Sequence, residues 1–248
     1  MKLQDKVVIV TGGGRDIGAA CAIDLAAHGA SVLITYHASA EGANDVVSTM
    51  QAMGSRAKAI KADLTKKADV DATVQMALDT FGKIDSLVHV SGGLIARKKI
   101  TEMDLMHWNK VLEVNLTSLF LMSNAVIPHL KSGSSIVTFA SQAARDGGGG
   151  GSVAYATSKG AVTTFTRGLA KELGPDIRVN CVCPGMINTK FHDDFTSDDI
   201  RAKVAAGVPL QREGKADEIA KLVTFLTSSD SSYMTGTNID INGGGVFS

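Results

Sequence analysis

Near its start the chain reads Val7-Val8-Ile9-Val10-Thr11-Gly12-Gly13-Gly14-Arg15-Asp16-Ile17-Gly18. The run of β-branched residues indicates a buried strand, the three consecutive glycines a tight turn, and the residues after them the start of a helix. A glycine-rich turn in this position lets the backbone approach a pyrophosphate, which the positive end of the helix attracts. The segment therefore predicts a dinucleotide site, with Gly12, Arg15, Asp16 and Ile17 among its contacts.

Short strand-like runs alternate with longer amphipathic segments along the rest of the chain. Strands are predicted at Val7–Val10, Ser31–Thr35, Arg56–Lys61, Ser86–Val90, Ser135–Phe139, Ile177–Val182 and Asn238–Ile241. Helices are predicted at Ile17–His28, Ala40–Met53, Lys66–Phe81, Met103–Leu130, Val153–Leu173 and Ala216–Ser228. This alternation predicts an α/β protein with a doubly wound, parallel, seven-stranded sheet and helices on both faces. No linker or repeat divides the 248 residues, so we expect a single domain over residues 1–248.

Two segments interrupt the alternation. Asp146 to Gly151 contains five consecutive glycines, and residues 186–208 carry a polar, helix-like insertion over Phe191 to Ala205. Flexible segments beside a site often serve as lids, and we expect residues 186–208 to be a substrate lid. The alternative is that both segments are simply mobile surface. For the insertion over residues 186–208, the sequence supports this alternative and the lid equally.

Composition excludes several classes of function. Lys plus Arg equals Asp plus Glu at 25 each, so no net field favours nucleic acid or an anionic membrane, and no apolar run approaches the length that spans a bilayer. The first residues lack the apolar region of a signal peptide. Cys21, Cys181 and Cys183 have no metal-like spacing, which predicts no metal site and buried free thiols in a reducing cytoplasm.

The end of the second strand bears on which dinucleotide binds. Proteins that prefer NAD usually place a carboxylate there, whereas this chain has Thr35-Tyr36-His37-Ala38-Ser39. The guanidinium of Arg15 suits a phosphate in charge and shape, with Tyr36, His37 and Ser39 beside it, so we predict NADPH over NADH. The alternative is that Arg15 is a solvated surface cation. After the third strand, Asp63 and Leu64 are predicted to contact the adenine, although an Asp there is also a common helix cap.

A tyrosine and a lysine four residues apart, Tyr155 and Lys159, lie in a predicted helix. Residues at this spacing share one face, so the phenol and the ammonium point into the same space. A nearby cation favours the charged form of a phenol, whose ordinary pKa near 10 makes it a poor proton carrier. Ser141 and Asn115 lie upstream in the chain, and these four residues are the candidate catalytic group.

Together these features resemble the short-chain dehydrogenase/reductase superfamily over essentially the whole chain. The matching positions are Thr11-Gly12 through Gly18, Asp63, Asn115, Ser141, Tyr155, Lys159, Pro184-Gly185 and Thr189. The segments Pro209 to Gly214 and Asp240 to Gly245 are similar to those of the 3-oxoacyl-[acyl-carrier-protein] reductase subgroup. The resemblance implies a Rossmann fold and adds Ser91, Gly92, Pro184, Gly185, Ile187 and Thr189 to the cofactor site.

The resemblance also implies hydride transfer from NADPH to a ketone, either a 3-oxoacyl thioester or a small carbonyl compound. Tyr155 would act as general acid, Lys159 would lower the phenol's pKa and bind the nicotinamide ribose, and Ser141 would hold the carbonyl oxygen. Asn115 would anchor a water that passes protons to Lys159. Each also has an ordinary structural role open to it: core aromatic, surface cation, strand-end cap and helix-kink residue. The competing functions are an alcohol or sugar dehydrogenase working oxidatively, a non-catalytic NADP(H)-binding regulator and a structural subunit.

Three positions depart from the family pattern. The usual glycine is replaced by Asp16, which we expect to face outward as a helix cap. The usual Asn-Asn-Ala-Gly is His89-Val90-Ser91-Gly92, and Ser141 and Tyr155 are one residue further apart than is common.

Among partners, the family implies a homotetramer or, second, a dimer. An acyl carrier protein would require a basic surface, for which Arg97, Lys98, Lys99 and Arg145 are candidates. The alternative is that these residues are simply solvated.

Overall fold

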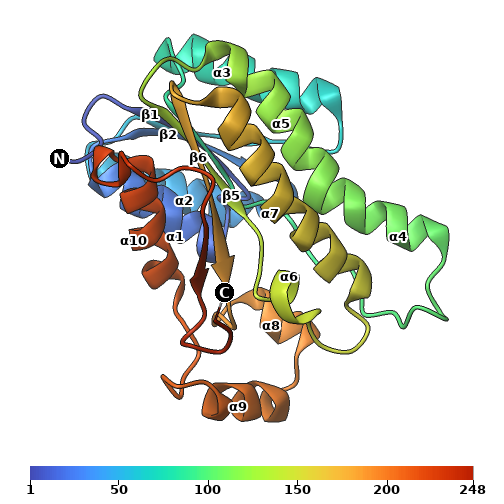
Figure 1. Ribbon diagram of the computed structural model, residues 1–248. Coiled ribbons are helices and arrows are strands. Elements are labelled where there is room, and N and C mark those ends of the chain that lie inside the picture. The colour runs from blue at the N-terminus through green and yellow to red at the C-terminus, as the bar shows by residue number, and fades with distance from the viewer. Residues whose placement is uncertain (248) are drawn as a thin grey trace.

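The computed structural model describes residues 1–247 and is built around one parallel sheet (Figure 1). Its strands are β1 (Val7–Thr11), β2 (Ser31–Tyr36), β3 (Ala57–Lys61), β4 (Ser86–His89), β5 (Ser134–Phe139), β6 (Ile177–Pro184) and β7 (Asn238–Ile241). They are arranged in the order β3-β2-β1-β4-β5-β6-β7, and every neighbouring pair is parallel. The predicted Rossmann fold is therefore confirmed. The strand order reverses between β1 and β4, and in such sheets the crevice at this switch point binds the ligand.

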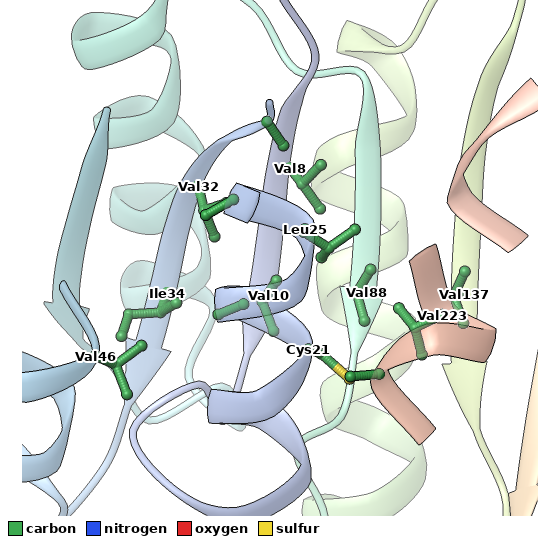
Figure 2. Close-up of a cluster of buried hydrophobic side chains, with 14 of the residues drawn as sticks. Val8, Val10, Cys21, Leu25, Val32, Ile34, Val46, Val88, Val137 and Val223 are labelled. Atoms are coloured by element: carbon green, nitrogen blue, oxygen red, sulfur yellow. The ribbon is translucent and has the colours of Figure 1, made fainter. Parts of the chain in front are cut away.

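Alternate residues of the strands face two separate cores. One core lies under α1 (Asp16–Ala27), α2 (Ala40–Ala52) and α10 (Ala216–Thr227), and Figure 2 shows strand valines such as Val8 and Val10 packed there against Leu25. The other lies under α3 (Lys67–Phe81), α5 (Ser118–Val126) and α7 (Val153–Leu173). Each central strand is covered on both faces, which explains why the sequence shows continuous apolar runs in place of alternation.

The prediction of one regular helix over Met103–Leu130 is wrong. It consists of α4 (Leu105–Leu112), a π-helical turn η1 (Glu113–Thr117), α5 and a 3₁₀ turn η2 (Ile127–His129). The stretch Leu105–His129 contains an 18-residue window with a mean hydropathy of 1.4 and is, by length and composition alone, apolar enough to cross a membrane, although it is no uninterrupted apolar run. Its apolar side packs on α3 and α7 and contributes to the sheet core, as a core helix of a Rossmann fold does.

The insertion predicted as one helix over Phe191 to Ala205 is two helices, α8 (Lys190–Phe195) and α9 (Asp198–Gly207). Thr196 and Ser197 between them are extended, and Ser197 directly precedes two aspartates, residues that favour a helix start. Figure 1 shows both helices beyond the carboxyl end of β6, with α8 beside the short helix α6 (Ala143–Asp146) and α9 further from it. The remaining described element is the 3₁₀ turn η3 (Ser229–Ser231). The other predicted strands and helices begin and end within two residues of those in the structure.

Candidate active site

A single cleft of about 800 Å³ lies at the carboxyl ends of the central strands. It is lined by nearly all of the predicted site residues: Gly12, Arg15, Asp16, Ile17, Tyr36, His37, Ser39, Asp63, Leu64, Ser91, Gly92, Ser141, Tyr155, Lys159, Pro184, Gly185, Ile187 and Thr189. The predicted residue that does not line it is Asn115, which is buried behind the wall. Sequence segments separated by up to 177 positions thus meet at one place.

The glycine turn forms a cradle that leaves no room for side chains. Gly12 has a φ of 66°, and a Cβ at Gly18 would lie 2.1 Å from the carbonyl oxygen of Gly12. Gly12 also donates its N–H to the Thr35 hydroxyl on β2 at 3.2 Å, which ties the turn to the neighbouring strand. An unobstructed backbone next to the start of α1 fits the pyrophosphate of a dinucleotide. The backbone of this part of the cleft leaves room for NADP(H), and Asp16 is the one acidic side chain of the described residues 12–18.

Asp16 lies in this cradle but does not face outward as we expected. Its φ of 52° is left-handed, a conformation that glycine adopts without cost and Asp tolerates better than most residues. Its Oδ1 accepts a hydrogen bond of 3.2 Å from the backbone N–H of Lys190, the first residue of α8. Its Oδ2 lies 3.7 Å from Nε of Arg15. The carboxylate therefore faces the start of α8 across the cleft, and residue 15 is the helix cap position.

The far end of the cleft has the composition expected for the 2′-phosphate of NADPH. Arg15 lines it together with Tyr36, His37 and Ser39, and no acidic residue follows β2 before α2 begins. Asp63 stands nearby, and its Oδ1 accepts from both the N–H and the hydroxyl of Thr65 at 3.0 and 2.7 Å. These bonds lower the pKa of Asp63 below its ordinary value, so the residue organises its own turn while one carboxylate oxygen remains for a ligand.

His89 replaces the first asparagine of the family pattern and is fully buried. Its Nδ1 lies 3.3 Å from the Thr11 hydroxyl, and its Nε2 lies 3.2 Å from the Ser118 hydroxyl. Thr11 accepts from the N–H of Ser91 at 3.0 Å, and Ser118 donates to the Val114 carbonyl at 2.7 Å. Burial lowers the pKa of His89 to about 3, so the ring is neutral.

These four hydrogen bonds assign the His89 tautomer. The Ser118 proton is committed to Val114, so Ser118 must accept from Nε2–H, and the Thr11 proton is then free to go to Nδ1. The histidine therefore joins the ends of β1 and β4 to the π-helical turn η1.

Asn115 sits in η1, where the widened turn is a frequent feature of functional sites. Its side chain donates to the carbonyls of Gly93 and Val111 at 2.8 and 2.9 Å and accepts from the N–H of Gly93 at 3.0 Å. A Cβ at Gly92 would lie 2.6 Å from Asn115 Oδ1, which explains why glycine is required there. Asn115 therefore holds the loop after β4 against η1 and the end of α4.

Tyr155 and Lys159 lie on α7 with the ammonium 5.8 Å from the centre of the phenol ring. Nζ of Lys159 donates to the Phe139 carbonyl at 2.8 Å, and burial lowers the pKa of Lys159 to about 8. Burial raises the pKa of Tyr155 above its ordinary value, and a hydrogen bond with Ser141 lowers it only in part. Desolvation of the buried phenol is thus the larger effect and sets the net direction of its pKa, which is the opposite of the direction we expected from Lys159 alone.

Ser141 follows β5, and its Oγ also accepts from the N–H of Ala143 at 3.2 Å, so it acts as a cap as well as facing the phenol. At the end of β6, a Cβ at Gly185 would lie 2.7 Å from Cα of Asn242, which accounts for the Pro184-Gly185 pair. Thr189 is buried, and its hydroxyl donates to the Ile187 carbonyl at 3.0 Å.

Sequence reasoning missed the residues that attach the lid. Arg97 donates to the Phe195 carbonyl at the end of α8 and to the Gly150 carbonyl in the glycine run, at 2.9 and 3.0 Å. Arg201 on α9 makes a bidentate pair with Glu213 at 2.7 Å and contacts Asp193 at 2.6 Å. Phe191 stacks near Tyr155, with ring centres 5.9 Å apart. The aromatic spacing within the lid was the signal available for Phe191, whereas the arginine contacts join distant segments and leave no local pattern.

Comparison with known proteins agrees with this geometry. Residues 12–245 match the family model described as "Enoyl-(Acyl carrier protein) reductase". The hydroxynaphthalene reductase-like protein Arp2 of Metarhizium acridum is 35% identical, and the match covers 98% of this chain and 96% of that protein.

Two solved structures have the same fold. A short-chain dehydrogenase/reductase from Serratia marcescens has a TM-score of 0.93 at 36% identity, over 98% of this chain and 99% of that one. A short-chain dehydrogenase from Burkholderia cenocepacia in complex with NADP has a TM-score of 0.92 at 37% identity, over 99% of each chain. With its sheet order, its glycine cradle and this likeness over nearly its whole length, the chain belongs to the short-chain dehydrogenase/reductase superfamily and is an NAD(P)-dependent oxidoreductase.

Proposed function

We propose that the protein reduces a ketone to a secondary alcohol with NADPH as the cofactor. The observation that carries the proposal is the convergence of Ser141, Tyr155 and Lys159 in the same cleft as the glycine cradle and Arg15. A binding protein or a structural subunit would not need a phenol, a hydroxyl and a buried ammonium assembled at one end of a nucleotide cleft. The retained group therefore supports an enzyme over either of these alternatives.

The residues divide the chemistry between them. NADPH, when bound, supplies the hydride that adds to the carbonyl carbon. Ser141 donates to the carbonyl oxygen, which positions it beside Tyr155, and the phenol gives its proton to that oxygen as the C=O bond becomes a single bond. The raised pKa of Tyr155 keeps the phenol protonated at neutral pH, which suits a general acid in the reductive direction. Lys159 remains a cation below about pH 8 and stabilises the phenolate left behind.

Arg15 is the basis for proposing NADPH in place of NADH. It borders the cleft where a 2′-phosphate would lie, and no carboxylate occupies the end of β2. The same feature favours reduction over routine oxidation with NAD. Arg15→Glu should therefore weaken NADPH more than NADH, by about tenfold or more in the ratio of the two dissociation constants. A ratio unchanged by the substitution would make Arg15 a surface cation.

The structure gives less support to a carrier-bound thioester than to a small carbonyl compound. Arg97 donates hydrogen bonds to two backbone carbonyls. Arg145 forms an ion pair with Asp240 at 3.5 Å and donates to the Asn238 carbonyl. Of the four basic residues considered for docking, Lys99 and Lys98 remain, and Lys98 lies 3.5 Å from Asp104. An acyl carrier protein thus stays the weaker of the two substrate proposals.

We also propose that the protein forms a homotetramer and works in a reducing cytoplasm. Exposed apolar side chains on α4, α5 and α7, such as Met106, Phe120 and Val153, support an interface, and all three cysteines are buried free thiols as expected.

The deciding experiment follows nicotinamide absorbance with purified protein, NADPH or NADH, and a panel of ketones that includes an acetoacetyl thioester. Faster oxidation of NADPH than of NADH by any ketone is the expected result. Tyr155→Phe should bind NADPH with nearly the wild-type dissociation constant and lose turnover by about a hundredfold or more. Retained turnover in this variant would remove Tyr155 from the mechanism.

A further inference from the structure

The lid places an aromatic cluster directly beside the proposed proton donor. The Phe191 ring lies 5.9 Å from the Tyr155 ring at an angle of 38°. Two further rings contact Phe191 at steep angles: His192 at 5.1 Å and 78°, and Phe195 at 5.2 Å and 60°. All of these separations lie in the range in which aromatic rings attract one another. The plane of Phe191 is therefore fixed from two sides by its neighbours before any substrate arrives.

Part of the wall around this cluster is apolar. Leu94 and Ile95 line the cleft on the loop after β4, and Ile200 and Val204 line it on α9. Ile95, Ile200 and Val204 are 43, 54 and 37% exposed, which is unusual for aliphatic side chains that line a concavity. Such exposed apolar surface around a cleft is typical of a binding site for an apolar ligand. The part of the cleft that the lid covers is thus suited to a hydrophobic body.

Every charged side chain around this lid end already has a partner within residues 1–247. Arg97 donates to two carbonyls, Asp146 accepts from Gln142 and Gly148, and Asp194 accepts from Lys190 at 2.6 Å. Burial lowers the pKa of His192, which keeps its ring neutral. The buried ammonium of Lys159 donates to Phe139. The carboxylates at this end are therefore hydrogen-bonded, whereas Arg97 and Lys159 keep positive charges that backbone carbonyls orient without neutralising.

We infer that the substrate is a ketone whose carbonyl-bearing ring is fused to an aromatic ring, and that the aromatic ring packs against Phe191. This inference rests on the proposed ketone reduction and adds the class of substrate. A flat ring suits the site better than a linear acyl chain, because the fixed plane of Phe191 is complementary to another plane. A chain with many rotatable bonds would also lose more conformational entropy on binding.

The test compares two ketones of the same skeleton, 2-tetralone and trans-2-decalone, which differ in the aromatic ring. Neither carbonyl is conjugated, so their intrinsic reactivities are similar. The wild-type enzyme with NADPH should show the higher kcat/KM with 2-tetralone. Phe191→Leu keeps an apolar side chain but removes the ring, and it should reduce the ratio of the two kcat/KM values about fivefold, equivalent to about 1 kcal/mol.

Two further variants and a binding measurement make the result specific. Phe191→Tyr keeps the ring and should keep the preference, and Phe120→Leu, an equivalent change on the exposed side of α5, should leave the ratio unchanged. Calorimetry with the product 2-tetralol should show a dissociation constant about fivefold weaker in Phe191→Leu than in wild type, which reports the contact without turnover.

The outcomes separate this inference from the proposed function. An unchanged ratio in Phe191→Leu overturns the aromatic contact, as does reduction of an acetoacetyl thioester with no activity toward 2-tetralone. In both cases ketone reduction itself stands. If neither the cyclic ketones nor the thioester oxidises NADPH or NADH, the proposed function fails and the inference falls with it.

Discussion

At the scale of single residues, His89 shows how a substitution within a family pattern is accommodated. Its two nitrogens satisfy two buried hydroxyls, and the chain of bonds that results connects the turn at Ser91 to the π-helical turn that carries Asn115. A buried hydroxyl without a partner costs about 1–3 kcal/mol, so the histidine is stabilising only as long as it is neutral. Protonation would place a second donor against a hydroxyl whose own proton already points at it.

His89 should make the protein sensitive to acid. Its pKa is about 3 in the folded chain and near 6.5 when unfolded, so the unfolded state binds more protons between these values and stability falls as pH drops below about 6.5. From pH 7 to pH 5 the loss from this residue is about 2 kcal/mol. His89→Asn should lose less stability over that interval in urea titrations at the two pH values. His129→Asn, at an exposed histidine, is the matched control and should behave as wild type.

Lys159 should give the reductase a falling limb in its pH profile. Burial lowers the pKa of this ammonium to about 8, so its charge is present below that pH and is lost as pH rises through it. If the charge stabilises the tyrosinate formed at Tyr155, kcat/KM for ketone reduction should decline above about pH 8. Lys159→Arg, at whatever residual rate, should move this limb upward because a guanidinium stays charged. A limb that stays near pH 8 in the variant would assign it to another group.

At the scale of elements, the proposed lid of α8 and α9 is attached to the scaffold at three points. The first residue of α8 donates to Asp16 in the glycine turn, and the carbonyl of its last residue accepts from Arg97. The following helix, α9, is held by the pair between Arg201 and Glu213. The Arg201 side chain is 15% exposed, which gives its charge-assisted, bidentate bonds more strength than a surface pair would have.

Loss of the Arg201 pair should loosen the ketone site and leave the nucleotide site intact. Arg201→Met is expected to raise KM for the ketone about tenfold while the dissociation constant of NADPH changes by less than about twofold, because α9 lines the lid end of the cleft. Arg212→Met removes a bidentate pair with Glu218, and the Arg212 side chain is more exposed. It is the control and should affect neither quantity. If Arg201→Met and Arg212→Met change the KM for the ketone and the dissociation constant of NADPH equally, the proposed lid does not depend on the pair between Arg201 and Glu213.

The elements also show how far a single sequence can predict a structure. Strand-helix alternation and the glycine turn carry local signals, so the sheet, its helices and the residues around the cleft were predictable. The contact of Asp16 with Lys190 joins residues 174 positions apart and depends on where the lid packs. The direction of the pKa change at Tyr155 depends on how deeply the phenol is buried. The four-residue spacing between Tyr155 and Lys159 carries no information on burial. The π-helical turn has no compositional signal that distinguishes it from α-helix.

At the scale of the whole molecule, α4 and α5 present apolar side chains to the outside. Leu105 and Met106 are 72 and 77% exposed, and Phe120 is 51% exposed, although α5 also covers the sheet. A monomer rarely leaves such large apolar side chains clustered on one layer of helices, and the same residues would be covered in a symmetric assembly.

Phe120→Glu should therefore disrupt the proposed tetramer. A charge buried at a symmetric interface is opposed by its own copy as well as by desolvation, so the variant should elute as a dimer or monomer in size-exclusion chromatography with light scattering. The wild type should elute as a tetramer of about four times 25.8 kDa. A variant that stays tetrameric with unchanged melting temperature would move the interface elsewhere.

The π-helical turn has a consequence for how the chain can change in length. Such a turn holds one residue more than an α-helical turn, and removing a single residue from Glu113–Thr117 would restore regular winding from α4 to α5. Because the wider turn absorbs its extra residue, the deletion would leave α4 and α5 in about the same relative orientation but would remove the turn that presents Asn115 to Gly93. Homologues should therefore accept substitutions in this stretch more readily than insertions or deletions, and a chimaera joined inside it would have to preserve the register.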